Sequence, residues 1–73
     1  MKVREALSAA AKRLAAVSDT PRLDAELLMA QALGISREAL LLGDSDREAP
    51  PAFADLLARR LRHEPIAYIC GRR

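Results

Sequence analysis

The sequence predicts an all-α fold, namely a small bundle of about five helices, two of them short, packed orthogonally. Apolar side chains recur every three to four residues along most of the chain, which is the period of an α-helix. No alternating run of β-branched residues is long enough to predict a strand. Phe53 and Tyr68 are the only aromatic residues, so we expect helices that approach closely through leucine and alanine.

The first helix is expected over residues 2–17. Apolar residues spaced alternately four and three apart form one face of this helix: Val3, Leu7, Ala10, Leu14 and Val17. Its basic residues fall mainly on the other side. Charged residues interrupt any apolar stretch that could serve as a secretory signal, whereas a basic, amphipathic mitochondrial presequence stays open as an alternative.

The second helix is expected from Pro21 to Leu33. Thr20 can cap its start, Pro21 suits the first helical position, and Gly34 can end it in a left-handed conformation. Gln31 is the only polar residue among the last seven of this helix. A helix that is apolar on nearly every side is expected to lie at the centre of the bundle.

Three further elements follow. Ser36 can cap a short helix that runs to Gly43, and residues 44–50 read as a polar loop. A longer helix is expected from about Pro51 to His63, and a last apolar turn over residues 65–70. The predicted core comprises Leu7, Leu14, Leu27, Leu28, Leu33, Phe53, Leu57 and Leu61.

A chain of 73 residues predicts one domain, residues 1–73, and is too short for a Rossmann unit with its cofactor. The three glycines are isolated at helix ends, so no phosphate-binding loop is encoded and we expect no S-adenosylmethionine binding by this chain alone. One histidine and one cysteine cannot complete a metal site. We therefore expect no catalytic, cofactor-binding or metal-binding residue here.

Individual candidate groups are better explained structurally. Cys70 lies in an apolar run and is expected to be a small buried hydrophobe, and His63 is expected at a helix end. Asp24 and Glu26 are two residues apart on a helix and face different ways, so they are not an acid–base pair. A single cysteine and the absence of a secretion signal favour a reducing compartment, the cytoplasm, with no membrane partner.

The net charge of +2 is unevenly distributed. Residues 1–49 carry seven basic and eight acidic side chains, whereas residues 50–73 carry five arginines and two acids. A solvated helix face is the ordinary explanation of such a run. The hypothesis weighed against it is a partner-binding or interdomain surface formed by Arg59, Arg62, Arg72 and Arg73.

A DNA-binding helix-turn-helix is the competing interpretation of residues 25–43, where Ala30, Gly34 and Leu40 have the spacing of that motif. Its second helix would have to present polar side chains to base edges, yet it holds three consecutive leucines. The acidic residues that follow would repel phosphate. We therefore expect no direct contact with nucleic acid.

Two segments of the chain resemble one protein family. They are Thr-Pro-Arg-Leu-Asp-Ala-Glu-Leu-Leu at residues 20–28 and, following Arg59-Arg60, Glu-Pro-Ile-Ala-Tyr-Ile at residues 64–69 with Gly71. Together with Ala-Leu-Gly at residues 32–34, they are similar to the N-terminal domain of the HemK/PrmC family of release-factor glutamine methyltransferases. Cys70 departs from the pattern, which usually has leucine or another uncharged residue there.

The resemblance implies a noncatalytic, substrate-recognising domain joined to a Rossmann-like domain that binds S-adenosylmethionine. Such an enzyme is implied to methylate the glutamine of the Gly-Gly-Gln motif in class I peptide-chain release factors, so its partners would be the release factor and its own catalytic domain. Two alternatives stay open: the branch that methylates a large-subunit ribosomal protein, and a free-standing helical interaction module.

Overall fold

The computed structural model describes residues 1–43 and 46–70 of the chain. Within these ranges it contains five helices and no strand beyond one isolated bridge. The helices are α1 (Val3–Leu14), α2 (Pro21–Leu33), α3 (Arg37–Gly43), α4 (Pro51–Leu61) and α5 (Ile66–Ile69). The predicted all-α class and the short third and fifth helices are thus confirmed.

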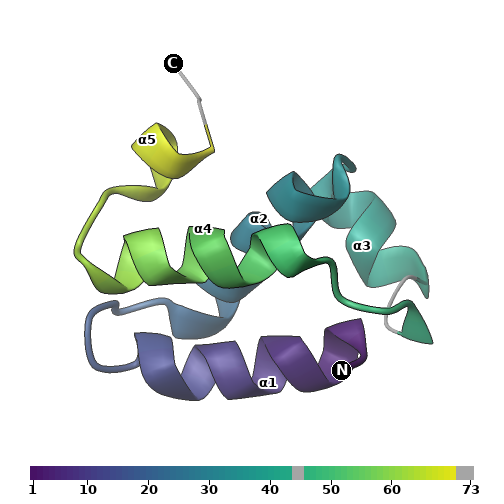
Figure 1. Cartoon of the computed structure of the whole chain (residues 1–73), viewed down its shortest axis with the longest axis horizontal. Coiled ribbons are helices and arrows are strands. Elements are labelled where there is room, and N and C mark those ends of the chain that lie inside the picture. Colours follow the sequence, from purple (N-terminus) through teal and green to yellow (C-terminus); the bar gives the residue numbers. More distant parts are fainter. Residues whose placement is uncertain (44–45, 71–73) are drawn as a thin grey trace.

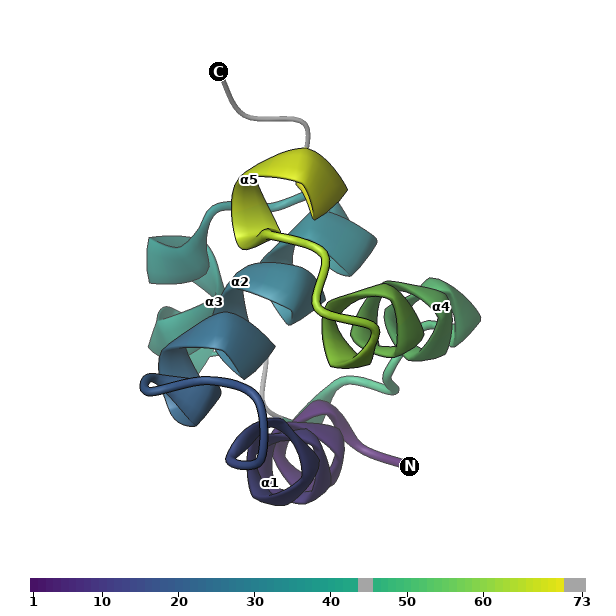
Figure 2. The same ribbon diagram turned by 90° about the vertical axis from the view of Figure 1, so that its left-hand side faces the viewer.

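Helix α2 is the centre of the arrangement, as its apolar composition predicts. It contacts each of the other four helices. In Figure 1, α1 and α4 lie one above the other and run in the same direction, while α2 passes obliquely behind them. Figure 2 views α1 and α4 nearly end-on, with α5 above α2 and α3 to its left. Most of the chain is therefore organised around a single helix.

The core is built from small side chains. Leu7, Leu14, Leu28, Phe53 and Leu57 are buried as predicted. Four alanines are buried with them, all on α1 and α2: Ala6, Ala10, Ala25 and Ala30. These two helices share the most extensive interface of the bundle, because an alanine lets two helix backbones approach closely.

The predicted core was wrong in three places. Leu27, Leu33 and Leu61 are only half-buried, whereas Leu40 and Ile69 from the two short helices are buried instead. Helical periodicity identifies an apolar face but does not show which part of it another helix covers. Two short helices too small to be expected in the core thus close it.

Two helices end on a residue with a left-handed backbone. After α2, Gly34 has a φ of 72°, and the amides of Gly34 and Ile35 donate to the carbonyls of Gln31 and Ala30. After α4, His63 has a φ of 70°, and the amides of His63 and Glu64 donate to Arg60 and Arg59. Both ends are Schellman motifs, which satisfy the last helical carbonyls. His63 does lie at a helix end, but in a conformation that ordinarily favours glycine.

The helices start at the predicted capping residues, but only one of the two predicted capping hydrogen bonds is formed. The Ser36 hydroxyl accepts the amide of Ala39 at 3.1 Å, as an N-cap should. The Thr20 hydroxyl instead donates to Asp24 Oδ1 at 3.3 Å. Helix α1 ends at Leu14 rather than near residue 17, because the chain tightens there into turns in which the Val17 amide donates to the Leu14 carbonyl.

The N-terminus pairs with the segment before α4, which the sequence did not predict. The Val3 amide donates to the Arg47 carbonyl at 2.8 Å and the Ala49 amide to the Met1 carbonyl at 2.9 Å. The Met1 amine also donates to Glu48, which raises the pKa of the amine and lowers that of the carboxyl. A short antiparallel contact thus ties the start of α1 to the entry of α4.

Candidate protein-interaction surface

The acidic residues of α2 are buried and paired with arginines. Arg60 of α4 donates through Nε to Asp24 Oδ2 at 3.2 Å, and its Nη2 lies 3.4 Å from the Val17 carbonyl. Only 8% of the Asp24 side chain and 16% of the Arg60 side chain are exposed. This network joins α2, α4 and the loop after α1 at one point.

The buried carboxylate of Glu26 pairs with two more exposed arginines. Arg37 of α3 donates to its Oε1 at 2.9 Å, and Arg22, one turn earlier on α2, donates to Oε2 at 3.0 Å. Asp24 and Glu26 therefore do face different ways, and each serves as an anchor for another helix. A buried carboxylate that lost its arginine would be left uncompensated, so these residues are structural.

The arginines predicted to form a basic surface are partly neutralised. Arg59 donates from Nε and Nη2 to Glu64 Oε1 at 3.1 and 2.9 Å, and Arg62 Nη2 lies 3.8 Å from Glu64 Oε2. The hydrogen bond from Arg59 holds the Glu64 pKa below its ordinary value. The pair therefore stabilises the fold at neutral pH, and this contribution is lost as the pH falls through the lowered pKa.

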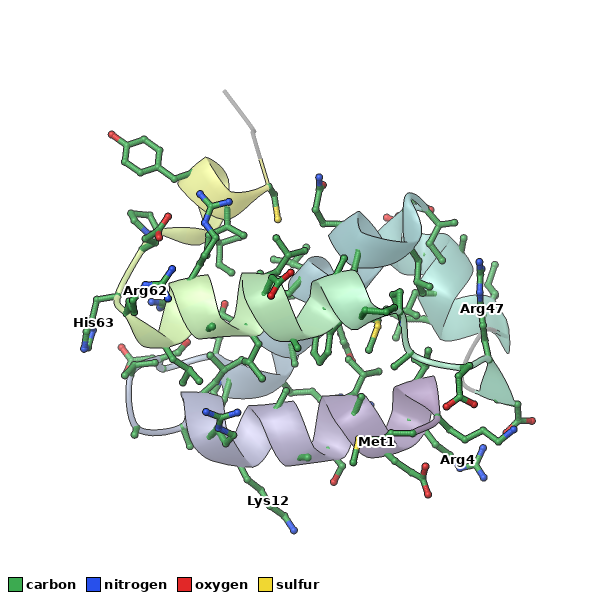
Figure 3. All side chains as sticks on the ribbon, viewed as in Figure 1. Met1, Arg4, Lys12, Arg47, Arg62 and His63 are labelled. Atoms are coloured by element: carbon green, nitrogen blue, oxygen red, sulfur yellow. The ribbon has the colours of Figure 1, made fainter. Side chains whose placement is uncertain are left out.

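Arg62 is the more available of the two described arginines. It is exposed at the end of α4, and Figure 3 shows its side chain near His63 at one end of the molecule, away from Lys12 on α1. The predicted surface residues Arg72 and Arg73 lie outside the described residues. The role of these four arginines in partner binding or domain docking stays a prediction.

An apolar groove lies elsewhere, over one face of α2. It has a volume of about 450 Å³ and is bounded by residues of α2, by the start of α3 and by α5. Its lining includes Leu23, Leu27, Ile35, Ile66 and Cys70. Cys70 is half-buried here, with its sulfur 4.0 Å from the Leu27 carbonyl. Leu27, which helical periodicity predicts in the core, lines this groove instead, and the sequence did not predict the groove.

Two other kinds of site find no support in the described part of the chain. Nowhere in residues 1–43 and 46–70 do three or more His, Cys, Asp or Glu side chains gather as a metal site would require. No helix within these ranges combines the length and apolar character needed to cross a lipid bilayer. Among the described residues, the surfaces that could contact a protein include the basic end of α4, the groove over α2, and the outer face of α1 around Arg4, Lys12 and Arg13.

Comparison with known proteins identifies the family. The family described as the PrmC N-terminal domain matches residues 5–71. The chain belongs to the PrmC N-terminal domain family. Within it, the segments of residues 20–28 and 59–69 supply the buried pair Asp24–Arg60, the pair of the buried Glu26 with the exposed Arg22, and the more exposed pair Arg59–Glu64. The residues that carry the resemblance thus hold this PrmC N-terminal domain together.

Most of the relatives of this PrmC N-terminal domain are named release factor glutamine methyltransferase. The release factor glutamine methyltransferase of Mycolicibacterium smegmatis is 43% identical over 72 residues, 96% of this chain and 26% of that protein. The protein of the same name from Coxiella burnetii is 39% identical over 79 residues, all of this chain and 27% of that protein. A bifunctional methyltransferase of Rickettsia conorii is 38% identical over 73 residues, 94% of this chain and 14% of that protein.

The chain therefore spans about a quarter of the length of the relatives named first. No solved structure matches it significantly.

Proposed function

We propose that this chain is the substrate-recognition domain of a methyltransferase that uses S-adenosylmethionine to methylate the glutamine of the Gly-Gly-Gln motif in class I release factors. The observation that carries the proposal is the family match over residues 5–71, with relatives named release factor glutamine methyltransferase that are about four times longer. The catalytic and cofactor-binding residues would lie in a second, Rossmann-like domain.

The architecture of the chain supports a recognition role better than a catalytic one. Its charged residues of lowest exposure, Asp24 and Glu26, are held in ion pairs with arginines and so are not free to act on a substrate. What the domain presents outward is an apolar groove and a basic helix end, both suited to protein contacts. A cytoplasmic location would accord with a partner that acts on the ribosome.

The named relatives also favour a release factor over the alternatives. Those from Mycolicibacterium smegmatis and Coxiella burnetii carry release factor in their names, which supports this substrate over a ribosomal protein. Their greater length argues against a free-standing interaction module. These alternatives remain outcomes of the experiment.

The test compares the full-length protein with a variant that lacks residues 1–70. Both are assayed for methyl transfer to an intact class I release factor and to a short peptide that contains Gly-Gly-Gln. If the domain recognises the protein substrate, the deletion lowers kcat/KM for the intact release factor and leaves the value for the peptide nearly unchanged. An equal loss on both substrates would contradict a recognition role, and methylation of a ribosomal protein instead would overturn the substrate.

The basic end is proposed to steer the release factor or to dock the catalytic domain. Replacing Arg59 and Arg62 by glutamine in the full-length protein should lower kcat/KM at low salt and much less at high salt, because salt screens exposed charges. The matched control replaces Lys12 and Arg13, two exposed basic residues in the last turn of α1. A loss of kcat/KM in the control variant alone would show that the steering surface lies on α1. Unchanged kcat/KM in both variants would show that Arg59 and Arg62 belong to an ordinary solvated face.

A further inference from the structure

The groove over α2 is formed because two helices flank it without meeting. Within the described residues, α3 and α5 each contact α2 but not each other. Figure 2 shows α5 above α2 and α3 to its left. The face of α2 between them carries Leu23, Leu27 and Gln31, spaced four residues apart. One face of the central helix is therefore left uncovered by the bundle.

The exposed material in this groove is mainly apolar. Leu23 is 38% exposed, and Leu27, which helical periodicity places in a core, is half-buried against the groove instead. Two polar residues of its rim are already engaged: Arg37 binds Glu26, and the Ser36 hydroxyl accepts the Ala39 amide. Gln31 and Glu38, both exposed, also line it. An occupant would bury the apolar side chains between these polar residues, which is the usual pattern of a protein interface.

We propose that the catalytic domain of the same polypeptide docks into this groove. The proposal rests on the proposed function, in which a methyltransferase domain follows this chain. The walls of the groove are α2, the segment that leads from α2 into α3, and α5 through Ile66 and Cys70. In the longer protein the polypeptide that continues beyond α5 would therefore start at the rim of the groove.

The covalent link between the two domains favours the catalytic domain as the occupant over a free protein partner. The chain spans about a quarter of the length of its relatives, so most of a relative's polypeptide lies outside this region. A segment joined by a short linker is present at an effective concentration of roughly millimolar, well above that of a free partner in a cell. The nearest apolar surface in the same molecule thus has first access to the groove.

The test is hydroxyl-radical footprinting of the full-length protein, alone and with a class I release factor. The oxidation rates of Leu23 and Leu27 are compared with that of Leu42, an 87% exposed leucine on α3 that does not line the groove. We expect Leu23 and Leu27 to be protected without release factor and Leu42 to stay reactive. Protection that appears only with release factor, only at high protein concentration, or under no condition would overturn the proposal.

A variant sharpens this measurement. Leu23→Gln in the full-length protein should lower the docking equilibrium constant about tenfold and restore the reactivity of Leu27, because one apolar contact is lost. Leu42→Gln is the matched control and should change neither. Methyl transfer to the release factor is measured on the same wild-type sample. Absence of methyl transfer would refute the proposed function. Methyl transfer by a protein in which Leu23 and Leu27 stay reactive would refute only the docking of the catalytic domain into the groove.

Discussion

The two sides of α2 differ in how they are completed. Toward α1 and α4, buried alanines and leucines form the core, and the Asp24–Arg60 pair joins α2 to α4. Between α3 and α5, the same helix presents Leu23 and Leu27 to an open groove. An apolar side chain on α2 thus has a different energetic role on each side, although the sequence pattern of the helix is nearly uniform.

The difference shows how a small domain distributes its apolar residues. A domain of this size buries only part of its surface, so it cannot cover every face of its central helix. The covered side supplies the stability, and the uncovered side is available for contacts with another unit. The stability of the domain and its proposed contact with the catalytic domain therefore involve different faces of one helix.

The largest effect should separate two adjacent leucines. Leu28→Ala is expected to lower the free energy of unfolding of the 73-residue chain by about 2 to 5 kcal/mol, because a fully buried side chain leaves a cavity. Leu27→Ala, on the groove side, should cost about 1 kcal/mol. Urea unfolding followed by circular dichroism measures both. Equal losses would mean that the groove side contributes as much as the core.

A smaller change in the free energy of unfolding is expected on breaking the Asp24–Arg60 ion pair, which joins α2 to α4. Arg60→Met keeps part of the aliphatic stem but leaves Asp24 buried without its cation, which should cost about 2 to 3 kcal/mol because Arg60 is not fully buried. The control Arg62→Met, at an exposed arginine, should change the free energy of unfolding by less than about 0.5 kcal/mol.

The double variant Asp24→Asn with Arg60→Met provides the decisive comparison. It removes the uncompensated charge and should recover part of the loss seen in Arg60→Met alone. If the double variant is as unstable as the sum of its single changes, the two side chains do not interact as a pair. The measurement is again urea unfolding, at neutral pH.

The smallest effect concerns the two left-handed residues that lead into α3 and α5. His63→Gly should raise the free energy of unfolding by about 0.5 to 1 kcal/mol, because glycine adopts a φ of 70° without a steric cost. Gly34→Ala should lower it by about 1 kcal/mol for the same reason. Thermal unfolding should show that Tm rises for His63→Gly and falls for Gly34→Ala. A change of Tm in the same direction for both variants would show that the left-handed backbone is not the cause.

Local signals account for what could be predicted of the elements. Pro21, Gly34, Ser36 and Pro51 act on the backbone within a few residues, and the structure places helix boundaries at each of them. His63 escaped this reasoning because its left-handed conformation follows from the Schellman motif around it, without the glycine that usually signals one. Among the ion pairs of residues 1–43 and 46–70, Arg22–Glu26 has the four-residue helical spacing by which such a pair can be predicted.

The sequence by itself determined the all-α class, the order of the helices and the central place of α2, because helical periodicity and caps depend on neighbouring residues. The tertiary structure decided which apolar face stays open and which charges are buried. Asp24 meets Arg60 across 36 residues and Glu26 meets Arg37 across 11. Such contacts depend on how whole helices are placed, and no local pattern in the chain encodes that placement.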